Sequence, residues 1–151
     1  MITKLENSNE LIAEQIHAIF QSSYAVEAQL IGVLDFPPLS RSVKDIANSK
    51  THFYGFSDNN FLAAVIEIEI AENKLDIHSL TVGANHFRKG IADQLINYVL
   101  TTFDITTATV ETAVLNMPAI KLYEKHGFLE NRRWTPSHGI EKLAMSVNFA
   151  I

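Results

Sequence analysis

One stretch, residues 75–103, constrains the fold more than any other part of this chain. A strand-like run over residues 75–82 leads into a short loop, and an amphipathic helix follows Gly90 over residues 91–103. Apolar side chains recur in that helix at three- and four-residue steps, which is the spacing that buries one stripe of a helix. The stripe consists of Ile91, Leu95, Val99 and Phe103. The pattern predicts a strand–loop–helix unit that turns at Gly90.

The start of this predicted helix is suited to an anion. The first N–H groups of a helix have no partner within it, and the aligned peptide dipoles make that end positive. Arg88 and Lys89 add two cations at the same place. The residues indicate a phosphate-bearing ligand on the amides of residues 88–92, although a turn with two solvated basic side chains would also account for them.

Apolar periodicity and turn residues predict the other elements. Residues 8–23 form a helix, and residues 24–39 form a partial helix followed by a loop, because Pro37 and Pro38 cannot continue a helix. The remaining predicted elements are helices at 42–49 and 117–126 and strands at 51–57, 61–70, 106–115, 128–135 and 140–149. We expect an α+β domain with a mixed sheet, in which the strand at 106–115 runs parallel to that at 75–82 because a helix connects them.

Composition narrows the class of protein. The 151 residues predict a single domain over residues 1–151, and no apolar run approaches the ~20 residues that span a bilayer. A net charge of −5 argues against nucleic acid or a membrane surface as partner and favours a cationic substrate. The N-terminus has no signal-peptide pattern, so a cytoplasmic location is expected. The chain has no cysteine for disulfides or thiolate ligands, and its six histidines are scattered, so no metal site is predicted.

A second informative stretch covers residues 116–128. Asn116, Ala119 and Tyr123 fall at i, i+3 and i+7, so a polar group, a small residue and a phenol share one face of the predicted helix. A small residue between two polar ones leaves room for a ligand. A core tyrosine with an asparagine at the helix start would give the same spacing.

Together the two stretches resemble the GNAT family of acetyl-CoA-dependent N-acetyltransferases. The coenzyme motif of that family, Gln/Arg-x-x-Gly-x-Gly/Ala, corresponds to residues 87–92, where Phe87 departs from the polar first position. The later motif, Asn-x-x-Ala-x-x-Leu-Tyr-x-x-x-Gly-Phe, is matched at Asn116, Ala119, Leu122, Tyr123, Gly127 and Phe128. The resemblance covers nearly the whole chain. It implies an acyl-CoA N-acyltransferase-like fold, with a mixed, mostly antiparallel sheet flanked by helices and two strands splayed around the coenzyme.

The resemblance also implies which residues contact acetyl-CoA, the expected co-substrate. They are Leu80, Val82, Phe87, Arg88, Lys89, Gly90, Ile91, Ala92, Asn116, Ala119 and Tyr123. Main-chain atoms are expected to make most of these contacts. By the same resemblance, the Tyr123 hydroxyl protonates the leaving thiolate.

Transfer to an amine also needs a base, and the resemblance places it on the strand before the coenzyme loop. Asp76 and His78 lie there on one face, two residues or about 6.6 Å apart. His78 is preferred because an imidazole titrates near neutrality, although a hydrogen-bonded sheet histidine is an equal explanation. Glu67 and Glu69 are alternatives, but their alternation with Ile66, Ile68 and Ile70 predicts that both lie on a wet face of the sheet.

The resemblance also implies that the acceptor site lies between residues 24–39 and the loop around residues 134–139. Glu27 and Asp35 could bind an ammonium group there, whereas Arg132, Arg133 and Trp134 would favour an acidic or peptide-carboxylate acceptor. The expected function is acetyl transfer to a primary amine of a small molecule or peptide, and the alternative is a non-catalytic acyl-CoA-binding or sensing module. Acceptor identity, acyl length and oligomeric state are not readable from the sequence, and a homodimer remains an option.

Overall fold

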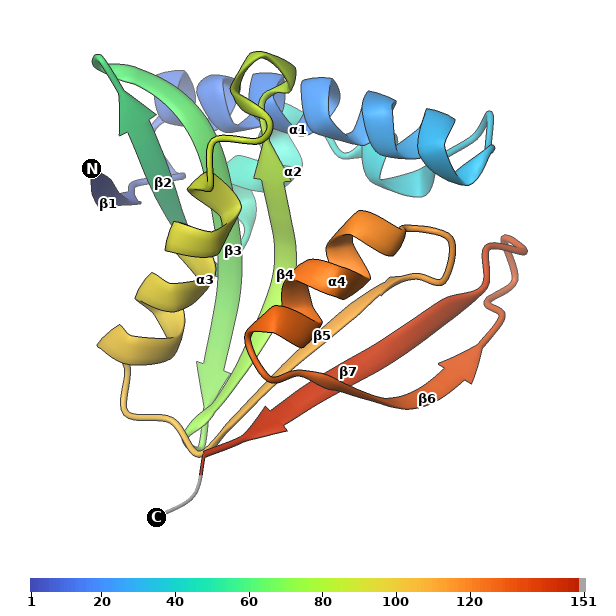
Figure 1. Cartoon of the computed structure of the whole chain (residues 1–151). Helices are drawn as coiled ribbons and strands as arrows, with labels where there is room; N and C mark the ends of the chain where they lie inside the picture. Colours follow the sequence, from blue (N-terminus) through green and yellow to red (C-terminus); the bar gives the residue numbers. More distant parts are fainter. Residues whose placement is uncertain (150–151) are drawn as a thin grey trace.

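Seven strands form one sheet with helices on both faces in the computed structural model, which describes residues 1–149 (Figure 1). The last two residues of the expected domain lie outside this range. The strands are β1 (Ile2–Leu5), β2 (His52–Asp58), β3 (Phe61–Ala71), β4 (Lys74–Val82), β5 (Thr107–Ala113), β6 (Leu129–Trp134) and β7 (Lys142–Asn148). The α-helices are α1 (Glu10–Ile31), α2 (Val43–Asn48), α3 (Ile91–Thr102) and α4 (Met117–Lys125), and two 3₁₀ turns are η1 (Pro37–Ser40) and η2 (Ala84–His86).

The sheet is mixed and mostly antiparallel, as predicted. Its strand order is β1-β2-β3-β4-β5-β7-β6. The β4–β5 pair is parallel and the other five neighbouring pairs are antiparallel. The parallel pair is the one joined through α3, which confirms the expectation drawn from the intervening helix.

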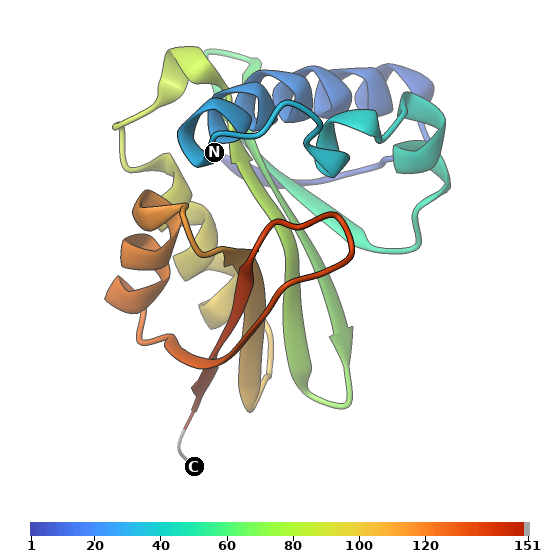
Figure 2. The same ribbon diagram turned by 90° about the vertical axis from the view of Figure 1, so that its right-hand side faces the viewer.

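The helices cover opposite faces of the sheet, and Figure 2 shows α3 and α4 on one side and α2 on the other. Adjacent residues of β2 separate the two cores, because side chains alternate along a strand. Tyr54 packs in the core beneath α3 and α4, with Leu95 and Val99. Phe53 packs in the core beneath α1 and α2, with Phe20.

Helix α1 is longer than the sequence predicted. The partial helix expected within residues 24–39 is present up to Ile31, but it continues α1 without a break instead of following the first helix as a less regular segment. It ends at Gly32, whose φ of +75° lets the chain reverse and whose N–H bonds back to Ala28 and Gln29. Pro37 and Pro38 follow only after this turn, so they do not end the helix. The extension carries Tyr24 and Glu27 over the sheet.

Strand β1 was not predicted. It has four residues, two of them polar, and pairs antiparallel with β2 at the edge of the sheet. The side chain of Leu5 packs over Gly55, where an added Cβ would lie 2.8 Å from Leu5 Cδ1. The other predicted helices and strands are present, with ends within two residues of the expected ones. No helix within residues 1–149 is both long and apolar enough to cross a membrane.

Candidate active site

Strands β4 and β5 separate at the middle of the sheet. They pair only from Lys74 with Thr107 to Ile77 with Val110. Beyond that point β4 stays with β3 up to Val82, and β5 stays with β7 up to Ala113, so the two strands diverge (Figure 1). The expectation of splayed strands is confirmed. Leu80 and Val82, the predicted coenzyme contacts on β4, lie in the diverging half.

The loop after β4 presents free amides at the open end of the splay. Gly90 is the N-cap of α3 with φ +74°, and Arg88 also has a positive φ of +64°. Within residues 1–149, the N–H groups of residues 87–93 donate no hydrogen bond. The side chain of Ile91 is buried in the core, so this residue can offer a ligand only its backbone. The backbone is therefore available for the anion that the sequence indicated.

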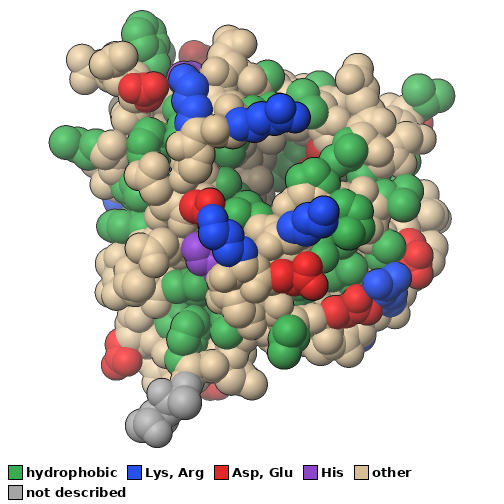
Figure 3. All heavy atoms as spheres, viewed as in Figure 1, with side chains coloured by type: hydrophobic (Ala, Val, Ile, Leu, Met, Phe, Trp, Pro, Cys, Tyr) green, Lys and Arg blue, Asp and Glu red, His purple; other side chains and the backbone are tan. Residues whose placement is uncertain are grey.

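A hollow opens beside this loop on the face that carries α3 and α4, and Lys and Arg side chains rim it (Figure 3). The surrounding segments contribute Arg88 and Lys89 from the loop and Lys121 and Lys125 from α4. Lys125 Nζ lies 2.9 Å from Asp93 Oδ2, which joins the end of α4 to the first turn of α3. The two elements that carry the predicted coenzyme motifs are thus tied to each other.

Helix α4 brings Asn116 and Tyr123 to the splay. Asn116 caps the helix by accepting a hydrogen bond from the Ala119 N–H at 3.3 Å. Tyr123 is 5% exposed and its ring meets the edge of Phe128 at 5.5 Å between centroids. Burial, and then the negative fields of Tyr24 and Glu27, raise the pKa of Tyr123, so its hydroxyl stays protonated.

Tyr24 and Glu27 of α1 reach the site from the other side of the sheet. Burial, with Glu27 as the next cause, raises the pKa of Tyr24, and the hydroxyl of Ser79 acts in the opposite direction. Burial likewise raises the pKa of the Glu27 carboxyl, while Asn116 and Lys142 lower it. Tyr24 and Glu27 of α1 and Tyr123 of α4 therefore lie near one another where β4 and β5 diverge. Helical spacing from the predicted N-terminal helix could have found Tyr24, had that helix been extended.

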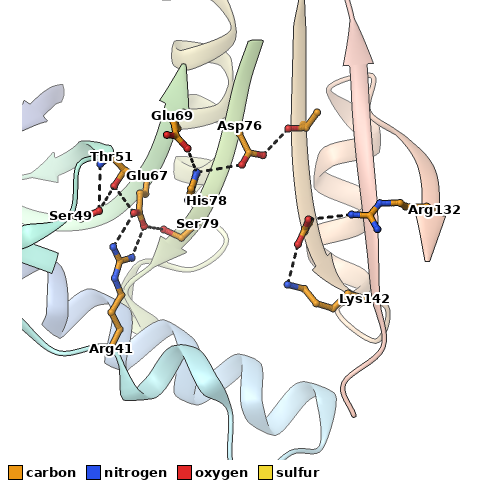
Figure 4. Close-up of polar contacts among 12 residues, drawn as sticks. Arg41, Ser49, Thr51, Glu67, Glu69, Asp76, His78, Ser79, Arg132 and Lys142 are labelled. Carbon is orange, nitrogen blue, oxygen red and sulfur yellow. Dashed lines mark hydrogen bonds and ion pairs between the residues drawn. The ribbon is translucent and has the colours of Figure 1, made fainter. Parts of the chain in front are cut away.

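Glu67 is buried, contrary to the prediction that it lies on a wet face. Its side chain is 2% exposed and accepts two hydrogen bonds from Arg41, at 2.7 and 3.0 Å (Figure 4). The hydroxyls of Thr51 and Ser79 donate to it at 2.6 and 3.0 Å. Burial alone would raise the pKa of Glu67, but these four hydrogen bonds and the charge of Arg41 outweigh it and lower the pKa. A carboxylate held in this way is a poor base.

Asp76, His78 and Glu69 form an exposed cluster on the same sheet (Figure 4). His78 Nε2 lies 3.1 Å from Glu69 Oε1 and 3.4 Å from Asp76 Oδ2. Asp76 accepts a hydrogen bond from the Thr109 hydroxyl at 2.7 Å. Asp76 and His78 share one face, as predicted. A β-bulge falls at His78, because Glu67 pairs with Ser79 and Ile68 with Ile77, so His78 is the first residue of β4 beyond the parallel pairing.

Two pockets are lined in part by residues of α1, one by Tyr24 and the other by Ile31. The first, which we call the Glu67 pocket, has a volume of about 440 Å³, and Tyr24, Arg41, His78 and Ser79 also line it. The second, which we call the Ile31 pocket, has a volume of about 310 Å³ and lies between the end of α1, the end of β5 and the β6–β7 loop. Its apolar lining residues are Ile31, Val33, Ala113, Leu115 and Ile140, and the β6–β7 loop adds His138, Gly139 and Glu141.

The other charged residues considered for the acceptor lie apart or are paired. Asp35 is exposed and lines neither pocket. Arg133 is bound to Glu130 at 2.7 and 2.9 Å. Arg132 stacks on Trp134, with its guanidinium carbon 4.0 Å from the ring centroid, and approaches Glu111 at 3.8 Å. Both guanidinium groups are therefore engaged within the protein.

A family profile described as "Acetyltransferase (GNAT) family" matches residues 13–128. The chain belongs to the GNAT family of acetyltransferases. The matched range includes the splay, the loop at Gly90 and the helix with Tyr123, so the family motifs and the observed site coincide. Belonging to the family fixes the class of protein but not its acceptor.

Known proteins similar to this chain differ in length and in sequence. The UPF0157 protein YqkA of Bacillus subtilis (strain 168) is 36% identical over 129 residues, which cover 85% of this chain and 38% of that protein. This chain thus spans well under half the length of that relative. Among solved structures, the ribosomal-protein-S18-alanine N-acetyltransferase from Escherichia coli superposes with a TM-score of 0.78 at 18% identity, covering 100% of this chain and 94% of that one.

A second solved structure with the same fold is PaiA N-acetyltransferase from Thermoplasma acidophilum, in complex with coenzyme A. Its TM-score is 0.76 at 16% identity, covering 99% of this chain and 98% of that one. At such low identity these structures establish that the fold is shared. The assignment of an acceptor needs the geometry of this chain's own site.

Proposed function

We propose that this protein transfers an acetyl group from acetyl-CoA to a primary amine. The proposal is supported mainly by the separation of β4 from β5, together with the amides of residues 87–93 that donate no hydrogen bond and the buried, protonated Tyr123 on α4. A thioester coenzyme needs an anion site, a place for an extended polar arm and a proton for its sulfur. The site offers all three.

The coenzyme would bind mainly through backbone atoms. Its pyrophosphate would lie on the amides of residues 87–92, where the positive end of α3 attracts anions. Its extended arm would follow β4 at Leu80 and Val82, replacing the hydrogen bonds that β5 does not make. Asn116, Ala119 and Tyr123 would line the other side.

The chemistry is a direct attack of the amine on the thioester. The amine nitrogen forms a bond to the acetyl carbonyl carbon, and the carbon–sulfur bond breaks. The nitrogen loses one proton to a base, and the departing thiolate takes one from Tyr123, which regains a proton from water. The products are an acetamide and the free thiol, so charge and atoms balance. A phenol is a suitable donor because it remains neutral until the sulfur becomes an anion.

His78 is the base in this proposal. It lines the Glu67 pocket beside Tyr24 and Ser79, and its contacts with Asp76 and Glu69 would stabilise the imidazolium formed when it takes the proton. Glu67 is unsuited because four hydrogen bonds favour its ionised form. Glu69 is the remaining alternative on the neighbouring strand.

The test combines thermal stability with turnover. Acetyl-CoA should raise the melting temperature, and thiol release from it should require an added amine. Stabilisation without turnover over a broad amine panel would instead indicate a non-catalytic acyl-CoA sensor. Neither stabilisation nor turnover would overturn both assignments.

A further inference from the structure

The Ile31 pocket begins next to the proposed reaction centre. Ile31 lies four residues after Glu27 on α1, so it is on the same side of the helix and about 6 Å further along its axis. Leu115, on the opposite wall, directly precedes Asn116, whose amide faces Glu27. An amine held at Glu27 would therefore have its substituent within reach of this pocket.

The Ile31 pocket is lined mainly by apolar side chains that the protein leaves accessible. Leu115 is 64% exposed although it lines a concave surface, whereas Ile31 and Ala113 form a buried floor at 6% each. Exposed apolar side chains in a concave site usually mark a ligand or partner surface. The volume of about 310 Å³ is at the lower end of small-molecule sites. An uncharged apolar group of modest size fits these features.

Some carboxylates around the site are paired and others are not. Glu67 is neutralised by Arg41, and Glu111 lies 3.3 Å from Lys142 and 3.8 Å from Arg132. Glu27 has no ion pair within 4 Å in residues 1–149, although Lys142 acts on it from a longer distance. Glu141, on the β6–β7 side of the Ile31 pocket, has no ion pair within 4 Å in the same range either.

We infer that the acceptor is a small primary amine whose apolar substituent binds against Leu115 and Ile31 in the Ile31 pocket while its ammonium group is attracted to Glu27. This inference rests on the proposed acetyl transfer and adds the class of amine to it. The polar groups of the Glu67 pocket bind one another and offer little to a highly polar acceptor. Selectivity comes instead from the apolar pocket.

The first experiment compares three amines with the wild-type protein by acetyl-CoA-dependent thiol release. They are 2-phenylethylamine, which is an apolar monoamine, ethanolamine, which is polar, and spermidine, which is a polyamine. An apolar group in a matching pocket contributes roughly 10–200-fold in kcat/KM. We expect an advantage of this size for 2-phenylethylamine over both other amines. Equal values, or a preference for ethanolamine or spermidine, would overturn the inference while leaving acetyl transfer intact.

The second experiment uses Leu115→Asn, with Leu11→Asn as a matched control. Both leucines are strongly exposed, so both variants should fold, and Leu11 lies about 30 Å from Ile31 along α1. Leu115→Asn should raise KM for 2-phenylethylamine about tenfold, leaving the ethanolamine values and the acetyl-CoA melting shift unchanged. Leu11→Asn should change none of them. An unchanged KM in Leu115→Asn would contradict the inference, whereas absence of turnover with every amine would remove the proposed function as well.

Discussion

Tyr123 is buried and yet close to the other residues of the candidate site. Its side chain is buried in the core cluster, which keeps the hydroxyl protonated, and it still lies close enough to Tyr24 and Glu27 of α1 for both to act on it. Ionisation of Tyr123 is opposed further by the neighbouring acidic groups Tyr24 and Glu27 of α1. The residue therefore still carries its proton when the thiolate forms beside it.

Replacing Tyr123 by phenylalanine tests this role directly. Tyr123→Phe should lower kcat by about 10²–10⁴-fold, which is the usual contribution of a positioned general acid. Acetyl-CoA affinity, measured by titration calorimetry, should change little because the ring remains. Tyr54→Phe is the matched control, since Tyr54 is a buried tyrosine packed on Tyr98 and Phe103 away from the splay. A normal kcat in Tyr123→Phe would remove the hydroxyl from the mechanism.

His78 is tested by its neutral amide counterpart. His78→Gln should reduce kcat by about 10²-fold or more, because glutamine cannot take a proton from the amine. Asp76→Asn should have a smaller effect, since Asp76 acts through His78 at 3.4 Å. His52→Gln, an exposed histidine of β2, should leave steady-state kinetics unchanged. If His78→Gln retained full kcat, Glu69 would become the leading candidate for the base.

Single residues were predicted well where the information is local. The spacing of Asn116, Ala119 and Tyr123 lies within one helix, so the sequence alone placed them on one face. Glu67 was misplaced because its partner Arg41 is 26 residues away, and strand alternation cannot reveal that a distant loop folds over a face. The alternation of residues 66–70 correctly predicted a strand, but it wrongly predicted that Glu67 is exposed to solvent.

Among the elements, the turn at Gly90 carries most of the coenzyme proposal. Gly90 and Gly32 make an instructive pair, because one begins α3 and the other ends α1. Their φ values are +74° and +75°, and an added Cβ would meet nothing within 4 Å at either site. Substitution should therefore cause the same backbone strain at both, without steric overlap.

The expected outcome separates stability from binding. Gly90→Ala and Gly32→Ala should each lower the free energy of unfolding by about 1–2 kcal/mol, the cost of a left-handed residue that has a Cβ. Only Gly90→Ala should also weaken acetyl-CoA binding, because it shifts the amides that precede α3. Urea unfolding gives the first quantity and calorimetric titration the second. Equal affinity in both variants would argue against the pyrophosphate position.

Periodicity predicted nearly all elements because most of them bury a single stripe or face. Periodicity failed for two segments, strand β1 and the end of α1. Strand β1 is too short to show alternation and is held by its neighbour β2, and the end of α1 projects past the core over the splay, so its pattern becomes mixed. Ala28 and Ile31 are buried there, whereas Glu27 is only half-buried, which is why Glu27 could be named from the sequence but not placed.

At the scale of the whole molecule, the Glu67 network joins the segment after η1 to the sheet. Arg41 reaches Glu67 from that segment, while its guanidinium lies 5.6 Å from the ring centroid of Phe20 and 5.7 Å from that of Phe53. Losing the carboxylate would leave a partly buried cation without its partner. The stability of the fold should therefore depend on this one group and on its ionisation.

Glu67→Gln should lower the free energy of unfolding at neutral pH by about 3–5 kcal/mol, as removal of one partner from a buried ion pair does. Because folding lowers the pKa of Glu67, the wild-type advantage is complete above the unfolded value of about 4.5 and is lost as pH falls through the folded value. Urea unfolding from pH 7 to pH 3 measures this. The matched variant Glu69→Gln, exposed on the same strand, should shift the free energy by less than about 0.5 kcal/mol. A wild-type advantage that persists unchanged at pH 3 would contradict the assignment.

The separation of β4 from β5 has a consequence for inhibitor design. If the coenzyme binds to main-chain groups that every member of such a fold possesses, a compound that imitates its arm would inhibit many acetyltransferases alike. A selective compound would have to extend past Glu27 into the Ile31 pocket, where side chains rather than the backbone form the walls. If the backbone binds the coenzyme and side chains bind the acceptor, the acceptor pocket can change from one family member to the next. The coenzyme site would be retained because it depends on the backbone and not on particular side chains.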